Sequence, residues 1–174
     1  MAAKAGVVAD IIDNIRRVFQ VVNEHSKRAK KETGITGPQL WAIKTIAQES
    51  PIMVSELARK MYLHPATVVG ILDRLEKQSL VARVRSTVDR RVVRIELTRQ
   101  GQELVRKAPK VAQGLLVEGL EKLSGNRLQN IDKGLNTLVD ILGAQSVPPR
   151  LILSSEVNKP KKTNVGSSRK KLPA

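Results

Sequence analysis

The chain gathers arginine residues in and around one short segment, "STVDRRVVRIELTRQG", which spans residues 86–101. Asp89 directly precedes Arg90 and Arg91, and the neighbouring arginines are Arg83, Arg85 and Arg94. A guanidinium group is planar and permanently charged, so it binds phosphate oxygens in bidentate fashion and suits a narrow groove of negative potential. We expect Asp89 to accept hydrogen bonds from Arg91 or from loop N–H groups and so to hold the loop in one shape. For Asp89 alone, a plain turn cap in a solvated hairpin is an equal alternative.

The segments on either side of this loop alternate apolar and polar residues, which is the period of half-buried strands. In residues 80–85, Leu80, Ala82 and Val84 alternate with Val81, Arg83 and Arg85, so the two groups would lie on opposite faces of a strand. Residues 92–97 set Val93, Ile95 and Leu97 against Arg94 and Glu96. The pattern predicts a β-hairpin whose connecting loop, from Ser86 to Arg91, projects beyond the sheet.

Two short helices with a tight turn between them are predicted before the hairpin. The first, in "PIMVSELARKM", is expected to be capped by Ser55, with Glu56 in its first turn, where the helix dipole favours an anion. The second, "HPATVVGILDRLEKQ", begins with His64 as the cap and Pro65 as the first helical residue. This arrangement is a helix-turn-helix, and a hairpin directly after it is a wing.

The second of these helices is the candidate recognition helix, and its outward face is poor in hydrogen-bond donors. Helical spacing buries Val68, Ile71, Leu72 and Leu75, and leaves Ala66, Val69, Gly70, Asp73 and Lys77 facing outward, with Thr67 and Arg74 on the flanks. Apolar groups touch thymine methyls and a glycine permits close backbone approach, but bidentate reading of guanine would fall to Arg74 at most. We favour a phosphate contact or an intrahelical ion pair for Arg74. Specificity then depends more on shape readout by the wing.

Amphipathic helices are predicted on both sides of this unit. Residues 6 to about 30 carry a helical stripe made of Val8, Ile11, Ile12, Ile15, Val18, Phe19 and Val22. A helix capped by Thr36 follows and ends near Ser50. Beyond the Thr98 cap, a run from Leu104 to Leu120 keeps helical phase with a kink expected at Pro109, and a last helix follows the break at residues 124–126. One wing domain cannot cover these stripes, so we expect pairing with a second subunit; a monomeric helical cap is the weaker alternative.

Composition limits the classes of function. The 174 residues carry a net charge of +15 at a pI of about 10.6, which indicates a polyanionic partner, either nucleic acid or an anionic membrane surface. No apolar run approaches the length that a bilayer requires, and Asp10 and Asp13 interrupt any signal peptide, so a cytoplasmic protein without a membrane partner is expected. The chain has no cysteine, and His25 and His64 are isolated, so no metal, cofactor or catalytic site is expected.

The C-terminal segment, residues 144–174, differs in composition from the rest. It holds four prolines and seven Lys or Arg against one acid, without any period. It is expected to be a disordered basic tail. A solubilising extension and a loose contact with DNA phosphates are equally favoured roles.

The stretch from "VSELARKM" to "LTRQG" resembles the MarR family of winged-helix transcriptional regulators. The resemblance is carried by the Pro65-led helix, "DRLEK", Asp89-x-Arg91, Leu97-Thr98 and Gly101, and extends more weakly over residues 6–143. It implies a homodimer on a palindromic operator in double-stranded DNA, with the recognition helix in the major groove and a wing arginine in the minor groove. It also implies a small, often aromatic, ligand that weakens DNA binding.

The predicted fold is mainly α with a small β-hairpin wing, a winged helix-turn-helix flanked by dimerisation helices. The expected divisions are an N-terminal dimerisation helix at 1–33, the DNA-binding domain at 34–101, C-terminal dimerisation helices at 102–143 and the tail. The expected function is a homodimeric transcriptional regulator, with repression favoured. A chromosome-coating protein of low sequence preference is the alternative, and an enzyme ranks third. The candidate DNA-binding residues are Arg91, Arg90, Asp89, Arg85, His64, Ala66, Thr67, Val69, Gly70 and Arg74.

Overall fold

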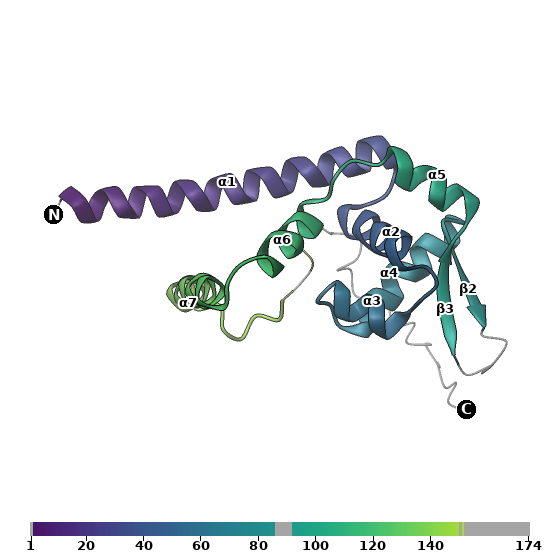
Figure 1. The fold of residues 1–174 in the computed structure, drawn as a ribbon. Helices are drawn as coiled ribbons and strands as arrows, with labels where there is room; N and C mark the ends of the chain where they lie inside the picture. The colour runs from purple at the N-terminus through teal and green to yellow at the C-terminus, as the bar shows by residue number, and fades with distance from the viewer. Residues whose placement is uncertain (1, 86–91, 150, 152–174) are drawn as a thin grey trace, which may run out of the picture.

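The computed structural model describes residues 2–85, 92–149 and 151, which form helices around one small sheet (Figure 1). The elements are α1 (Ala2–Thr33), α2 (Gly37–Glu49), β1 (Ile52–Met53), α3 (Val54–Lys60), α4 (Pro65–Lys77), β2 (Val81–Arg85), β3 (Val93–Leu97), α5 (Arg99–Lys107), α6 (Ala112–Glu121) and α7 (Gly125–Ile141). The predicted class, mainly α with a small β-hairpin, is confirmed. Within the described ranges, no helix is both long enough and apolar enough to cross a membrane.

The core lies where α2, α3, α4 and the sheet meet. The predicted buried stripe of α4 is confirmed, because Val68, Ile71, Leu72 and Leu75 are all fully buried. They pack in one cluster with α2 and with Ile95 of β3. This packing holds α4 by one face and leaves its opposite face outside the core.

The sheet has the strand order β1-β3-β2, and both pairs are antiparallel. β1 was not predicted, because two residues are too few to show an alternating pattern. The assignment of faces on β2 was wrong: Val81, which was grouped with the arginines, is buried and lies opposite Leu97. Arg83 lies opposite the buried Ile95, whereas Val84 lies opposite the exposed Arg94 and is itself 42% exposed. Directly opposed residues share a face of the sheet, so Arg83 lies on the core side and Val84 on the solvent side.

Of the four predicted helix caps, three residues stand at the cap position and one assignment is wrong. Thr36 is the N-cap of α2, and its N–H donates to Gln39 Oε1 at 2.8 Å. The N–H of Ala66 donates to His64 Nδ1 at 3.2 Å, and the N–H of Gly101 donates to Thr98 Oγ1 at 3.0 Å. Ser55 is not the cap of α3, because this helix begins at Val54 directly after β1. Its first turn is closed instead by the Glu56 carboxylate, which accepts from the N–H of Met53 at 3.1 Å.

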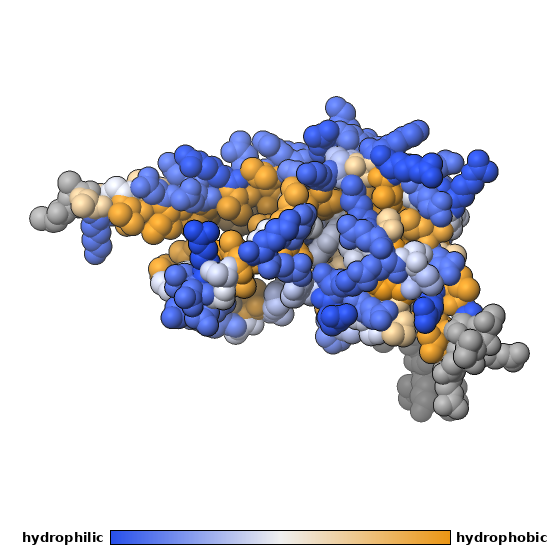
Figure 2. All heavy atoms as spheres, viewed as in Figure 1, coloured by the Kyte–Doolittle hydropathy of each residue, from blue (hydrophilic) through white to orange (hydrophobic). Residues whose placement is uncertain are grey.

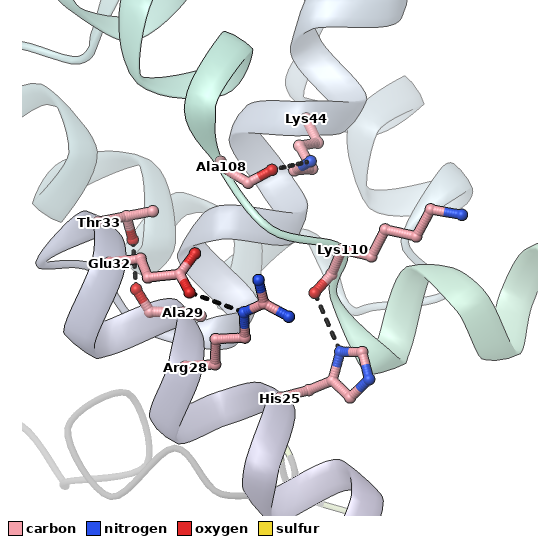
Figure 3. A network of polar contacts seen from close by, with 8 residues as sticks. All are labelled: His25, Arg28, Ala29, Glu32, Thr33, Lys44, Ala108 and Lys110. Atoms are coloured by element: carbon pink, nitrogen blue, oxygen red, sulfur yellow. Dashed lines mark hydrogen bonds and ion pairs between the residues drawn. The ribbon is translucent and has the colours of Figure 1, made fainter.

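Pro109 separates two helices, where only a kink was expected. α5 ends at Lys107, and Ala108 is extended, as the residue before a proline prefers to be. Two long-range hydrogen bonds hold the connector (Figure 3). Lys44 Nζ donates to the carbonyl of Ala108, and His25 Nδ1 donates to the carbonyl of Lys110, both at 3.0 Å. The connector is thereby fixed against both α2 and α1.

α1 and α7 extend away from the winged-helix unit. Figure 1 shows α1 as a long rod whose C-terminal end lies over the unit and whose N-terminal end projects beyond it, on the side where α7 lies. No residue of α7 is buried. These two helices therefore contribute little to the core of the single chain.

Candidate nucleic-acid interface

The outward face of α4 is open, as the helical spacing predicted. Ala66 and Val69 are exposed, and Thr67 and Gly70 are half-buried at its edges. A Cβ added at Gly70 would meet nothing within 4 Å, so the fold itself does not require a glycine there. The space outside Gly70 is available to a partner molecule.

His64 adds a donor at the exposed N-terminus of α4. Its Nδ1 accepts the hydrogen bond from Ala66, so in the neutral ring the proton is on Nε2. The side chain is exposed, and Nε2 is therefore an N–H donor beside the first turn of the helix. Backbone N–H groups at a helix N-terminus favour anions such as phosphate.

Arg83 links the hairpin to the recognition helix. Its guanidinium donates to the Asp73 carboxylate at 2.7 Å and also pairs with Glu76, both on α4. These hydrogen bonds and charges raise the pKa of Arg83 above its usual value, with the Asp73 hydrogen bond contributing most. The contact fixes the angle between α4 and the hairpin. Arg83 was named in the sequence analysis as an arginine near the loop and was assigned no role, although two acids three residues apart on the preceding helix could have indicated a structural partner.

Arg85 is the next residue of β2 on the same face as Arg83. It lies opposite Val93 in the register and is exposed. It therefore continues the α4-facing side of the hairpin toward the loop, and no carboxylate partner is recorded for it within the described chain. Arg94 lies on the other face, opposite Val84.

The tip of the hairpin, with Asp89, Arg90 and Arg91, falls outside the described residues, so those three assignments stay predictions. The strands that lead to it are described, and Figure 1 shows them extending beyond the helices. Residues 152–174, most of the predicted basic tail, also fall outside the described residues.

Arg74 is half-buried in the last turn of α4 and already takes part in an interaction within the chain. This engagement makes direct reading of a guanine base less favourable, as the sequence analysis expected. As for metals, no group of three or more potential ligand side chains lies together within the described part of the chain.

A cavity of about 370 Å³ lies between α2 and α6, and sequence reasoning did not identify it. Its lining combines Trp41 with three amines and two carboxylates, those of Lys44, Lys60, Lys110, Glu118 and Glu121. Burial, and next the nearby charge of Lys110, lower the pKa of Lys44. The cavity depends on the packing of α6 over α2, for which a single sequence offers no local signal.

Comparison with known proteins agrees with this geometry. The model of the MarR family matches residues 35–93. The organic hydroperoxide resistance transcriptional regulator of Bacillus subtilis (strain 168) is 35% identical over 108 residues, which are 62% of this chain and 72% of that protein. The HTH-type transcriptional repressor MdtR of the same organism is 32% identical over 95 residues, which are 55% of this chain and 61% of that protein.

A solved structure shares the fold. The structure of reduced AbfR bound to DNA aligns with a TM-score of 0.50 at 22% identity, covering 82% of this chain and 99% of that chain. The two relatives are named as a transcriptional regulator and a transcriptional repressor, and neither name describes an enzyme. A helix-turn-helix followed by a hairpin, together with these relatives, establishes that the chain belongs to the MarR family of helix-turn-helix transcriptional regulators.

Proposed function

We propose that the chain is a homodimeric repressor that binds a palindromic operator, with α4 in the major groove and the hairpin tip in the minor groove. The observation that carries this proposal is the clamp of Arg83 on Asp73 and Glu76. It holds an open helix face and an arginine-bearing hairpin in one fixed relation, and the chain has a net charge of +15. A rigid pair of this kind suits the spacing between adjacent grooves.

Base reading by α4 is proposed to be modest. Ala66 and Val69 present methyl groups that suit thymine, Gly70 allows close backbone approach, and Thr67 and His64 supply donors at the edge and at the N-terminus. Arg74 is assigned a phosphate contact, one of the two roles favoured for it from the sequence. Arg85, Arg90 and Arg91 are assigned to the wing contact, and Asp89 to shaping the loop. Most discrimination then comes from groove width at the wing.

The proposed dimer interface is the apolar surface that α1, α6 and α7 leave uncovered. Figure 2 shows a continuous apolar band along the side of α1 that faces α7. The exposed apolar side chains are Val7, Val8, Ile11, Ile12, Val18, Phe19 and Val21 on α1, Leu115, Leu116 and Leu120 on α6, and Leu128, Ile131, Leu135, Val139 and Ile141 on α7. A patch of this extent on one chain indicates a protein partner, and a second copy presents the same complementary elements. Sedimentation should give the mass of two chains; the mass of one chain would contradict the dimer.

The experiment that tests operator binding compares two duplexes at matched salt. One carries the DNA upstream of the protein's own gene, and the other is a scrambled sequence of equal length and composition. A repressor should bind the first at least about 10³-fold more tightly than the second. This factor is the lower end of the usual ratio of specific to nonspecific affinity. Equal affinities would favour the second candidate function, a chromosome-coating protein, which the donor-poor face of α4 suggests.

We further propose that a small aromatic acid binds the cavity between α2 and α6 and weakens operator binding. Trp41 offers a ring for stacking, and Lys44 and Lys110 offer charge to a carboxylate. One wall of the cavity belongs to the winged-helix unit and the other to the proposed dimer helices. A bound ligand can therefore change the orientation of the winged-helix unit relative to those helices.

Trp41 is the sole tryptophan of the chain, so its fluorescence reports on this cavity. Benzoate should change the emission of Trp41 and lower operator affinity, while neutral benzamide should have a weaker effect. Lys110→Gln should reduce the benzoate effect, because it removes one of the amines. The backbone carbonyl that binds His25 remains in this variant, so the connector keeps its contact with α1. Equal responses to benzoate and benzamide would contradict the role of the lysines.

A further inference from the structure

A second concentration of positive charge lies away from the recognition helix. Residues 25–33 at the end of α1 and residues 99–110, which include α5, together hold eight Lys or Arg against two carboxylates, a net charge of +6. All eight cationic side chains are exposed. Figure 2 shows this edge of the molecule covered by hydrophilic residues.

The two segments form one surface, because long-range contacts tie them together. His25 of α1 donates to the carbonyl of Lys110, and Lys44 of α2 holds the carbonyl of Ala108 in the same connector (Figure 3). The two carboxylates are already paired within their own helices. Glu32 accepts from Arg28 at 2.7 Å, and Glu103 lies 3.4 Å from Arg99.

Six cations remain. Lys30 donates to the carbonyl of Gly34 at 3.0 Å, and Lys110 lines the cavity between α2 and α6. We name the other four the α1–α5 basic surface: Lys27 and Lys31 of α1, and Arg106 and Lys107 of α5. Favourable charge at helix C-termini explains Lys31, Arg106 and Lys107 in part, since the helix dipole acts within the last turn. It does not explain Lys27, which lies more than one turn before the end of α1. Self-repulsion among these charges is relieved when a polyanion binds.

The proposed operator and dimer contacts leave this surface open. α1, α5 and α4 each pack against α2. In Figure 1, α5 and the end of α1 lie along the upper edge, whereas β2 and β3 run from there toward the lower right. The exposed apolar residues of α1 lie between Val7 and Val21, so a second copy would cover the N-terminal part of that helix.

We propose that the α1–α5 basic surface binds the phosphate backbone of a second DNA duplex, without sequence preference, while α4 and the hairpin hold the first. Duplex DNA is the occupant favoured by charge complementarity, because its phosphates offer evenly spaced anions to separate Lys and Arg side chains on two rigid helices. The inference rests on the proposed function for the first duplex only. Its consequence is that one dimer bridges two DNA segments.

The test uses the full-length protein and duplexes of about 20 bp, two helical turns, which are too short to pass from one face to the other. Immobilised operator duplex is saturated with protein, and a labelled random duplex is then added. The basic-surface variant is Lys31→Gln with Arg106→Gln and Lys107→Gln. A matched control removes three exposed cations elsewhere, with Lys4→Gln, Arg127→Gln and Lys133→Gln. Sedimentation and circular dichroism verify that both variants keep the wild-type assembly and helix content.

The wild type and the control should capture the random duplex, and the basic-surface variant should bind it at least about 10-fold more weakly. The variant's slope of log K against log salt for the second duplex should flatten by about 3, one phosphate contact for each cation removed. Its operator affinity should equal that of the control. Failure of the wild type to capture a second duplex, equal capture by the variant and the control, or capture of anionic vesicles in preference to DNA would each overturn the proposal.

Failure of the proposed function is seen separately. If the operator and a scrambled duplex bind with equal affinity, the proposed operator-binding function fails. The bridging experiment is then repeated with two random duplexes that carry different labels, in place of the operator duplex and the random duplex. Bridging that is lost in the basic-surface variant and kept in the control then still supports a second DNA surface, and no bridging refutes it.

Discussion

At the scale of single residues, the contact between Gly101 and Leu80 sets how the hairpin joins the C-terminal helices. A Cβ built on Gly101 would lie 2.1 Å from the carbonyl oxygen of Leu80. The same carbonyl accepts from the N–H of Thr98 at 3.2 Å, and the Thr98 hydroxyl donates to the carbonyl of Ser79 at 2.6 Å. The first turn of α5 is thus pressed against the start of β2, where only a hydrogen atom fits.

Gly101→Ala should therefore destabilise the protein, because either α5 or β2 must move to admit the methyl group. We expect a loss of about 3 kcal/mol in the free energy of unfolding, measured by urea denaturation. Gly70→Ala is the matched control, since its Cβ meets nothing within 4 Å and alanine favours a helix by about 1 kcal/mol. Equal stabilities of the two variants would show that the close approach at Gly101 is not present in solution.

Arg91→Ala tests the wing at the same scale. A guanidinium at the loop tip contributes to DNA contact and little to the core, so operator binding should weaken by about 1–3 kcal/mol per half-site. The unfolding midpoint and the sedimentation coefficient should not change. The measurement is an anisotropy titration at matched salt, and an unaltered affinity would remove Arg91 from the proposed interface.

At the scale of secondary-structure elements, the ion pairs of Arg83 with α4 connect the two parts that are proposed to contact DNA. The side chain leaves the core-facing side of β2 and reaches Asp73 and Glu76 on the helix. The pair of acids and the arginine come from adjacent elements. A loss of this contact changes the angle of the hairpin without removing any residue from the proposed DNA surface.

Arg83→Gln should lower operator affinity by about tenfold or less, the effect of losing a positioning contact and not a phosphate contact. The salt slope of operator binding should stay close to that of the wild type, because no cation that faces phosphate is lost. Asp73→Asn with Arg83→Gln should be no worse than Arg83→Gln alone, since both act on one contact. A salt slope reduced by about 1 would mean that Arg83 contacts phosphate directly.

Tyr62 joins the turn between α3 and α4 to α6. Its hydroxyl donates to the Glu121 carboxylate at 2.8 Å, and this hydrogen bond, followed by the charge of Glu121, raises the pKa of Tyr62. Tyr62 is the sole tyrosine, so an ultraviolet pH titration reports on it alone. Glu121→Ala should move the titration midpoint to lower pH, toward that of an ordinary tyrosine. An unchanged midpoint would show that α6 does not contact this turn in solution.

The elements that follow from local rules could be predicted from the sequence. The α4 stripe and the His64 and Thr98 caps depend on residues within a few positions of one another, and all are present. β1 and the face of β2 could not be predicted, because they depend on pairing with β3 and on the partner of Arg83. The open face of α4 was predicted for the same local reason, whereas the clamp and the cavity result from contacts between distant segments.

At the scale of the whole molecule, the chain divides its surface among three kinds of contact. The outward side of α4 and the hairpin is proposed to contact DNA, and the exposed apolar band of α1, α6 and α7 is proposed to contact a second copy (Figure 2). The α1–α5 basic surface lies apart from both. The uncovered apolar area is large for a single chain, which supports the proposal that a two-fold dimer recognises the operator.

The most direct test of this account is a hydroxyl-radical footprint of the wild-type protein on the DNA upstream of its own gene. A two-fold dimer presents two α4 helices and two hairpins to one side of the duplex. The account therefore predicts two protected half-sites related by a palindrome, with centres about 10 bp apart, one helical turn or a multiple of it. A single protected half-site, or uniform protection with no boundary, would contradict a dimeric operator-binding regulator.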